Sequence, residues 1–176
     1  VVICSPDKDL VQMVTGQRVV CLDRRKNVTI DEAGVWEKFG VSPESIPDYL
    51  GLVGDSVDCI SGVPGVGPVK ARALLEAFGS VEGIYSNLDK VGSLSLRGAT
   101  RLPDILAAHR ESAVLSKLLA TIVCDVSDDN ETFSNIKLET LARGHPDMNG
   151  LENFLEEYSF PGRDLDHILS PAGQLT

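Results

Sequence analysis

One stretch constrains the rest of the chain: residues Gly54 to Leu75, which read GDSVDCISGVPGVGPVKARALL. Two carboxylates, Asp55 and Asp58, stand three residues apart just ahead of a glycine-rich turn that opens into a helix. Carboxylates at this spacing can face a common cation, and glycines let backbone amides come close to a bound group. The stretch therefore predicts a metal site beside a phosphate-binding turn.

The spacing within this turn excludes two common nucleotide-binding motifs. A P-loop needs Lys and then Ser or Thr directly after its last glycine, but Pro68 follows Gly67. A dinucleotide fingerprint needs a third glycine where Lys70 stands. What remains is a hairpin between two helices whose amides near Gly65 and Val66 bind backbone phosphate without reading bases. A plain helical turn with a carboxylate cap is the alternative.

Two more carboxylates follow the first apolar run of the chain. The segment from Val1 to Ser5 predicts a buried strand, and the polar SPDKDLVQMV predicts a turn into a short helix. Asp7 and Asp9 therefore stand at the carboxyl end of a strand, where ligands gather in open α/β sheets. The alternative is that one of the two caps the following helix.

The next residues predict a hairpin and a helix. The alternating pattern from Arg18 to Ile30 indicates two strands joined by a polar turn, at an edge of the sheet. Asp31 is a good N-cap for the helix after it, and Gly40 ends that helix. Trp36 and Phe39 have the spacing of one helical face, which assigns Trp36 to the core rather than to a base-stacking surface.

The remainder of the chain is predicted to be mostly helical. Helices are expected over residues 42–53, 68–78, 80–88, 102–109 and 112–119, and a short strand over 121–126. The acidic run 127–134 lacks the glycine and the register of a calcium loop, so it predicts a solvated linker. Two short amphipathic helices are expected beyond it, over 151–158 and 165–169.

The distribution of charge bears on the kind of partner. The 176 residues have a formal net charge of −10, which by itself disfavours nucleic acid. Between Gly62 and Arg110, however, six basic and four acidic residues give a local charge of +2, which is compatible with a phosphate backbone. No apolar run reaches the roughly 20 residues of a membrane helix, so we expect a soluble protein.

The cysteines and histidines show no metal-binding pattern. The four cysteines are too far apart for a zinc pair or a redox CxxC motif, and three sit among apolar residues, as expected of buried, reduced thiols. The three histidines are scattered along the chain. Reduced thiols favour a cytoplasmic protein.

Four stretches of the chain together resemble one known family. They are SPDKDLVQMV, WEKFGVSPESIPDYLGLVGDSVDCISGVPGVGPVKARALLEAFGSVEGIY, LSLRGA and LLATIVCDV. In this order they resemble the 5′ nuclease (flap endonuclease) superfamily, most nearly the 5′-3′ exonuclease domain of bacterial DNA polymerase I and its stand-alone relatives. The resemblance implies an α/β fold in which a small, partly parallel sheet with an edge hairpin passes into a mostly helical, helix–three-turn–helix DNA-binding portion.

The resemblance also implies roles for particular residues. The implied catalytic ligands of two Mg²⁺ or Mn²⁺ ions, which activate water at the scissile phosphodiester, are Asp7, Asp9, Asp55 and Asp58. The implied contacts to the DNA backbone are Gly65, Val66, Gly67, Lys70 and Arg72. A monovalent cation, K⁺, is implied at the backbone carbonyls of Val63 and Val66.

The sequence departs from this family in three ways. Cys59 stands where the bacterial domains usually have Asn, and Val69 where many have Lys, so one DNA contact is expected to be weaker. The family's other metal carboxylates and its basic helical arch lie N-terminal to Val1, and no initiator methionine is present. We therefore expect a C-terminal portion of the nuclease domain, inactive alone, divided into nuclease core (1–53), helix–three-turn–helix region (54–126) and linker with helices packing on the core (127–176).

Three functions remain open from the sequence. For the intact protein we expect a metal-dependent 5′-3′ exonuclease and 5′-flap endonuclease. It would act on DNA with a flap, nick or end during replication and repair in the bacterial cytoplasm, alone or fused to a DNA polymerase. The alternative for this chain is a non-catalytic module that binds branched or nicked DNA. A third is a protein-interaction domain whose hairpin is only structural, which predicts no salt-dependent affinity for DNA.

Overall fold

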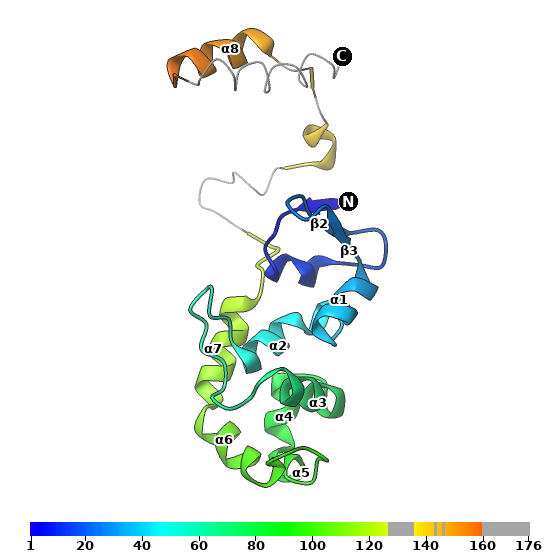
Figure 1. The fold of residues 1–176 in the computed structure, drawn as a ribbon, viewed down its shortest axis with the longest axis vertical. Coiled ribbons are helices and arrows are strands. Elements are labelled where there is room, and N and C mark those ends of the chain that lie inside the picture. The colour runs from blue at the N-terminus through cyan, green and yellow to red at the C-terminus, as the bar shows by residue number, and fades with distance from the viewer. Residues whose placement is uncertain (127–135, 143, 146, 160–176) are drawn as a thin grey trace. The chain divides into compact units, whose positions relative to one another are not determined.

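A small sheet and a series of short helices make up the first of two units, residues 1–124, in the computed structural model (Figure 1). The second unit is 125–176, and the structure describes residues 1–126, 136–142, 144–145 and 147–159. With η for a 3₁₀ helix, the elements of the first unit are β1 (Val2–Cys4), η1 (Asp9–Met13), β2 (Val20–Asp23), β3 (Val28–Ile30), α1 (Glu32–Phe39), η2 (Pro43–Ser45), α2 (Ile46–Val53), α3 (Pro68–Phe78), α4 (Val81–Ser86), α5 (Leu88–Val91), η3 (Ala99–Arg101), α6 (Leu102–Ala108) and α7 (Arg110–Ala120). The described part of the second unit contains η4 (Leu138–Leu141) and α8 (Met148–Glu157).

The sheet is mixed and has the strand order β1-β2-β3. β1 pairs with β2 in parallel, with Val2 opposite Val20, and β2 pairs with β3 antiparallel, with Cys21 opposite Ile30. A parallel pair needs a crossover connection, and here the chain crosses through η1. The predicted α/β fold with an edge hairpin is confirmed, and the crossover places η1 at the carboxyl end of β1.

Helix α1 begins and ends where the sequence predicts. The Asp31 carboxylate accepts the Gly34 amide at 2.9 Å, and Gly40 closes the helix in the left-handed region with φ 69°. The prediction for Trp36 is wrong, because Trp36 is 61% exposed whereas Phe39 is buried. A helix of two turns packs only one narrow stripe against the core, formed here by Val35 and Phe39, and Trp36 lies about 100° around the axis from Val35, at the edge of that stripe.

Helices α2 and α7 lie side by side and form the centre of the first unit (Figure 1). A Cβ at Gly51 would lie 2.8 Å from Cβ of Lys117, so the two backbones approach as closely as glycine allows. The Lys117 ammonium is 2.7 Å from both the buried Asp48 carboxylate of α2 and Glu82 of α4. One cation therefore ties three helices together.

Helix α3 follows the glycine-rich turn, as predicted. Pro68 is its first residue, Gly79 ends it, and it buries Ala71, Leu74 and Leu75. Helix α4 starts one residue after Ser80, whose hydroxyl accepts the Gly83 amide at 3.1 Å. The pair α3 and α4 continues the core of the first unit from α2.

The prediction of a strand after α7 and the prediction of three buried cysteines are both wrong. Residues 121–126 do not form a strand. The Gln12 amide group instead binds this end of α7, accepting the Ile122 amide at 3.0 Å and donating to the Ala120 carbonyl at 2.9 Å. Of the four cysteines, all free, only Cys21 is buried, because the others lie at an edge strand, in a turn and after α7.

Other expectations concern the C-terminal part. Helix α8 covers most of the predicted helix over 151–158, whereas the linker 127–134 and the helix over 165–169 lie outside the described residues. The division of the chain at residues 53 and 126 stays a prediction. Within the described ranges, no helix is long and apolar enough to cross a membrane.

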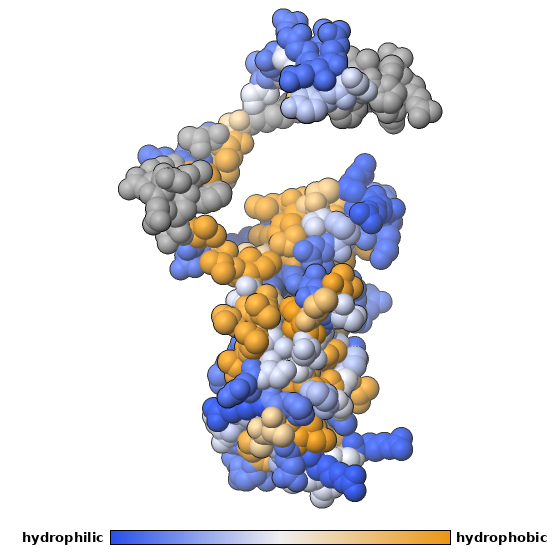
Figure 2. Space-filling view, turned by 90° about the vertical axis from the view of Figure 1, so that its left-hand side faces the viewer, coloured by the Kyte–Doolittle hydropathy of each residue, from blue (hydrophilic) through white to orange (hydrophobic). Residues whose placement is uncertain are grey.

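One face of α7 is apolar and exposed. Figure 2, which looks from the side on which α7 lies in Figure 1, shows apolar atoms gathered over the middle of the first unit. The exposed apolar residues of α7 are Val114, Leu115, Leu118 and Leu119. The opposite face of α7 buries Ala113, Ser116 and Ala120. We call the four exposed residues the outer face of α7.

Candidate metal centre and phosphate-binding turn

Three of the four predicted carboxylates come together. Asp9, Asp55 and Asp58 each present one carboxylate oxygen, and these oxygens all lie within 4.8 Å of one another. Asp55 is buried, Asp9 is half-buried and Asp58 is exposed, so the cluster opens to solvent on one side. We call these three residues the acidic cluster. It joins the crossover after β1 to the loop after α2.

The loop after α2 fixes Asp55 through its backbone. Asp55 and Ile60 exchange two hydrogen bonds of 2.8 Å, and the Asp55 carboxylate accepts the Val57 amide at 3.0 Å. Gly54 and Gly62 both have positive φ and press their backbones together, since a Cβ at Gly62 would lie 2.3 Å from the Gly54 nitrogen. The two glycines therefore close the loop at the position that carries the buried carboxylate.

Lys8 supplies the positive charge next to the acidic cluster. Its ammonium contacts Oδ2 of Asp55 in an ion pair and lies 3.8 Å from Oδ2 of Asp58. Asp55 Oδ2 nevertheless accepts no aligned hydrogen bond from the described residues, and neither does the buried Oδ1 of Asp9. We therefore describe the Lys8 contact with Asp55 as attraction between charges, while the buried Oδ1 of Asp9 is left able to accept a further ligand.

The carboxylates of the cluster perturb one another. Burial raises the pKa of Asp9, and the nearby carboxylates of Asp7 and Asp55 add to that rise. Burial also works to raise the pKa of Asp55, but the Lys8 ammonium and the Val57 amide outweigh it and lower the pKa. The pKa of Asp58 is raised, chiefly by its side-chain interaction with Asp55. Gathering three carboxylates is thus unfavourable until a cation balances them.

Asp7 is not brought into the acidic cluster. It is exposed, and its Oδ1 accepts the Asp9 amide at 3.0 Å. This contact forms an Asx turn just before η1. The N-cap residue of η1 is Lys8, without a side-chain cap bond, so the capping role that the sequence left open is not realised by Asp7. Asp7 acts on the cluster through its charge, which raises the pKa of Asp9 and of Asp58.

The acidic cluster fits a hard divalent cation. Its donor atoms are all carboxylate oxygens, the ligands that Mg²⁺ and Mn²⁺ prefer. Asp9 and Asp55 each have one buried carboxylate oxygen without an aligned hydrogen bond from the described residues, and Asp58 leaves an open side for solvent ligands. Mg²⁺ usually keeps several waters and binds through one or two carboxylates, so three carboxylates suffice for one ion.

The glycine-rich turn presents an open surface at the start of α3. At Gly65, with φ 79°, and at Gly67, a Cβ would meet nothing within 4 Å. The side chains of Val63 and Val66 are buried, and the Val66 amide donates to the Val63 carbonyl at 3.0 Å, so the turn is anchored from below. A hollow of about 230 Å³ lies over the first turn of α3, lined by Gly67, Pro68, Val69 and Lys70.

The two predicted basic contacts have partners within the chain. The Lys70 ammonium donates to the Gly65 carbonyl at 2.6 Å, which keeps it beside the turn. Nε of Arg72 donates to the Phe39 carbonyl at 2.6 Å, at the end of α1. Lys70 is therefore well placed for an anion in the hollow, whereas Arg72 already stabilises the end of a neighbouring helix.

Sequence reasoning missed two residues that position the loop. Ser116, buried in α7, accepts the Gly62 amide at 3.0 Å, and Ser112 donates to the Gly62 carbonyl at 2.7 Å. Both polar groups of a buried glycine are thus satisfied by one helix about 50 residues later. Two serines four residues apart, on one side of a predicted helix, are the only signal in the sequence. Sequence reasoning also missed Lys8, because its pairing with Asp55 depends on how the crossover between β1 and β2 is placed.

Comparison with known sequences gives one family and several relatives. Residues 41–149 match the family described as "5′-3′ exonuclease, C-terminal SAM fold". The chain is 42% identical over 173 residues to DNA polymerase I of Pseudomonas aeruginosa, covering 98% of this chain and 18% of that protein. It is 34% identical over 174 residues to the 5′-3′ exonuclease of Aquifex aeolicus, covering 98% of this chain and 54% of that protein. The chain thus spans about half of this stand-alone relative and about a fifth of that polymerase.

Comparison with solved structures agrees on the fold. A zinc-bound bacteriophage T5 5′-exonuclease superposes with a TM-score of 0.57 at 22% identity, covering 68% of this chain and 42% of that chain. The catalytic core of Rad2 in complex with a DNA substrate superposes with a TM-score of 0.53 at 19% identity, covering 97% of this chain and 56% of that chain. At these identities the likeness concerns the fold alone.

Proposed function

Because the chain belongs to the 5′-3′ exonuclease family, we propose that the protein is a divalent-metal-dependent 5′-3′ exonuclease and flap endonuclease. The observation that carries the proposal is the acidic cluster, three carboxylates within 4.8 Å at the loop that leads into the glycine-rich turn. Relatives named 5′-3′ exonuclease or DNA polymerase I support the reaction class. The metal-bound and DNA-bound structural neighbours support the two ligands.

The residues of the chain divide the work between metal and DNA. Asp9, Asp55 and Asp58 would hold Mg²⁺ or Mn²⁺. When bound, the ion lowers the pKa of a coordinated water and stabilises charge on the phosphodiester. The amides at Gly65 and Gly67, with Lys70 beside them, would bind a backbone phosphate at the start of α3. This contact reads no bases, so DNA binding should depend on salt and not on sequence.

The substrate is proposed to be DNA with a 5′ flap, nick or end. The phosphate-binding turn is joined to the acidic cluster by one hydrogen-bonded loop. This loop would keep a constant distance along the DNA strand between the bound phosphate and the cleaved phosphodiester. The link to a polymerase is supported by relatives that are DNA polymerase I. K⁺ at the turn is compatible with the Val66 carbonyl, whereas the Val63 carbonyl already accepts the Val66 amide.

The experiment is a cleavage assay on a 5′-flap duplex with Mg²⁺, with EDTA as the metal-free control. It uses the protein together with whatever residues its gene encodes before Val1. Asp55→Asn combined with Asp58→Asn should lower the cleavage rate by about a hundredfold or more, because the ligands of the ion are lost. Unchanged cleavage by this double variant would refute the assigned role of the acidic cluster.

A non-catalytic DNA-binding module is the second candidate for this chain. The observation that favours it is that Asp7 stands outside the acidic cluster, which leaves three carboxylates for a centre expected to hold two ions. Fluorescence anisotropy with a labelled nicked duplex separates the two candidates. Salt-sensitive binding without cleavage by the 176-residue chain supports the module, and cleavage by that chain rules it out.

A further inference from the structure

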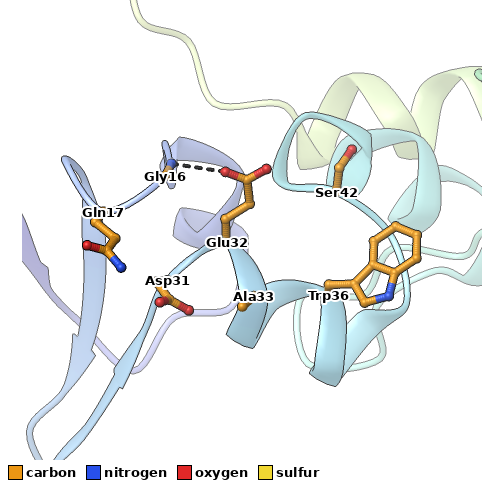
Figure 3. Close-up of a pocket in the computed structure, with 7 residues that line it drawn as sticks. All are labelled: Gly16, Gln17, Asp31, Glu32, Ala33, Trp36 and Ser42. Atoms are coloured by element: carbon orange, nitrogen blue, oxygen red, sulfur yellow. Dashed lines mark hydrogen bonds between the residues drawn. The ribbon is translucent and has the colours of Figure 1, made fainter.

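An exposed tryptophan separates two cavities on the first unit. The first cavity, of about 560 Å³, is lined by Gly16, Gln17, Asp31, Glu32, Ala33, Trp36 and Ser42 (Figure 3). The second cavity, of about 320 Å³, is lined again by Trp36 and Ser42, with Gly40, Val41, Ser45, Arg72, Leu75 and Glu76. Because the cavities share Trp36 and Ser42, they adjoin on either side of the indole. We call the two together the Trp36 groove.

The walls of the Trp36 groove are fixed by contacts within the fold. In Figure 3, Trp36 and Ser42 stand on one side of the first cavity, Gly16 and Gln17 stand on the other, and Glu32 reaches between them. Oε2 of Glu32 accepts the Gly16 amide at 3.1 Å, which ties the turn before β2 to the first turn of α1. Both cavities fall within the roughly 300–1,000 Å³ typical of ligand sites, so the groove is formed before any partner arrives.

The charges around the groove are mainly negative. Three carboxylates line it, from Asp31, Glu32 and Glu76, and the single cation is Arg72, whose Nε is already bound to the Phe39 carbonyl. In the described part of the chain, none of the three carboxylates forms an ion pair. Asp31 and Glu32 each use one oxygen for a backbone amide, which leaves the other oxygen able to accept.

We propose that the Trp36 groove docks a protein segment in which a lysine or arginine stands beside aliphatic residues. The cation stacks on the face of the indole, a favourable arrangement for tryptophan, while the carboxylates complement its charge. The aliphatic neighbours fill the cavities against Ala33 and the buried Leu75 and Val41. Exposed tryptophan set in a pocket is also the residue type that most often dominates binding energy at protein interfaces.

A single-stranded nucleic acid is the competing occupant, and the charges disfavour it. A base could stack on Trp36, but its phosphates would face the carboxylates of Asp31, Glu32 and Glu76 with only Arg72 to offset them. The phosphate-binding turn at the start of α3 shows the opposite arrangement, with open amides and Lys70. The docking site is therefore separate from the proposed nuclease function and stands whether or not the chain cuts DNA.

Trp36 is the only tryptophan of the chain, so its fluorescence reports on the groove directly. The probe is a short synthetic peptide of alternating leucine and arginine, with a leucine–glutamate peptide and a thymidine oligonucleotide as comparisons. We expect the leucine–arginine peptide alone to shift and quench the emission in a saturable manner. Its affinity should fall several-fold between about 50 mM and about 500 mM salt, because the contact is partly charged.

Matched variants locate the binding. By anisotropy with a labelled peptide, Trp36→Ala should weaken binding about tenfold or more and Glu76→Gln about threefold. The control Glu37→Gln, an exposed acid on the same helix that lines neither cavity, should leave the affinity unchanged. All three residues are exposed, and unfolding curves verify that the variants fold. The proposal is overturned if the leucine–arginine peptide does not bind, if Trp36→Ala leaves its affinity unchanged, or if the oligonucleotide binds instead.

Discussion

Lys8 is the residue whose charge determines how the acidic cluster behaves without a divalent cation. Its ammonium contacts the buried Asp55 and is near Asp58, so it partly balances three gathered carboxylates. The Lys8 ammonium is part of the chain and always present, whereas a metal ion can bind and dissociate. Removing the ammonium should therefore act in opposite directions on the metal-free and the metal-bound chain.

The first prediction concerns Lys8→Met. Without metal, the variant should lose about 1–2 kcal/mol of unfolding free energy, because Asp55 keeps its buried charge without a counter-ion. Added Mg²⁺ should stabilise the variant more than the parent, since the ion meets no competing ammonium. Urea unfolding with and without Mg²⁺ measures both effects. The control Lys26→Met removes an exposed ammonium that lies 3.7 Å from Asp23 and should change stability by about 0.5 kcal/mol at most.

The second prediction concerns pH and the ion pair between Glu82 and Lys117. The hydrogen bond from Lys117 lowers the pKa of Glu82 below its ordinary value of 4.5, so the folded state binds a proton there less readily than the unfolded state. The contribution is present above pH 4.5 and is lost as the pH falls through the lowered pKa. Glu82→Gln should therefore flatten the acid limb of the stability curve, by up to about 1 kcal/mol for a largely exposed carboxylate.

Urea unfolding at several pH values between neutrality and pH 3 measures this effect. Glu76→Gln is the control, because Glu76 is an exposed carboxylate without an ion pair among the described residues. The pKa of Lys117 is raised, since its bonds to Asp48 and Glu82 outweigh the opposing effect of burial. The stabilisation that Lys117 contributes is full below pH 10.5 and is lost as the pH rises through its raised pKa. Lys117 therefore keeps its charge throughout the acid range in which Glu82 is measured. An unchanged acid limb in Glu82→Gln contradicts the prediction.

At the scale of elements, α7 determines where the loop of the acidic cluster lies. Its two serines bind the amide and the carbonyl of Gly62, and Gly62 presses against Gly54, the residue before Asp55. Helix α7, which contributes no residue to the acidic cluster, thereby sets the position of the Asp55 carboxylate. The loop itself has no regular strand or helix, so this contact replaces the ladder of hydrogen bonds that a strand would have.

The third prediction concerns Ser116→Ala. The variant leaves the buried Gly62 amide without an acceptor and should lose about 1–3 kcal/mol of unfolding free energy. Because the loop also shifts, the affinity of the chain for Mn²⁺, measured by calorimetry, should fall several-fold. The matched control is Tyr85→Phe, which loses one buried hydrogen bond of 3.0 Å to the Leu106 carbonyl. That control should lose similar stability and keep its Mn²⁺ affinity, and equal Mn²⁺ affinities in both variants would remove the positioning role from α7.

Local signals in the sequence predict the elements well where the cause is local. Asp31 before α1, Gly40 after it and Pro68 at the start of α3 act through the backbone of their own helix, so the sequence alone identifies them. The fold family was also predicted correctly. Three of the four predicted carboxylates lie close together, and their role as metal ligands stays a prediction. Trp36 was misassigned because its burial depends on which stripe of a short helix the sheet and η2 cover.

The residues that sequence reasoning missed act across the fold. Ser116 and Gly62 are 54 residues apart, and nothing in either segment identifies the partner. The pairing of Lys8 with Asp55 likewise requires the crossover after β1 to meet the loop after α2. Asp7 shows the reverse case, because a local turn bond, from the Asp9 amide to the Asp7 carboxylate, competes with its expected role in the cluster. Long-range partners are set by packing, and one sequence does not specify them.

At the scale of the whole molecule, the first unit exposes a group of apolar side chains on α7. The outer face of α7 presents four large apolar side chains together, an arrangement that favours association in water. The net charge of −10 opposes association through repulsion, so the two effects depend differently on salt. Self-association of the isolated chain should therefore increase as salt is added.

The fourth prediction concerns Leu118→Lys. Leu118 is exposed on the outer face near the end of α7, where a cation also favours the helix dipole, so the variant should keep its stability. It should reduce the self-association measured by sedimentation velocity at high salt, because it interrupts the apolar face. The control Val57→Lys changes an exposed valine away from α7 and should leave self-association unchanged. Equal effects of both substitutions would mean that the outer face has no special part in association.

The contact between Gly54 and Gly62 has a consequence for how slowly parts of the molecule exchange hydrogen with solvent. The amides of Asp55, Ile60 and Val63 all donate to backbone carbonyls, and the Gly62 amide donates into α7. These amides belong to a loop, yet the Val63 amide is bonded to α2 and the Gly62 amide to α7, so the loop is held by both helices. In deuterium exchange they should persist as long as the amides of those helices, so the time scale of this loop is that of global unfolding.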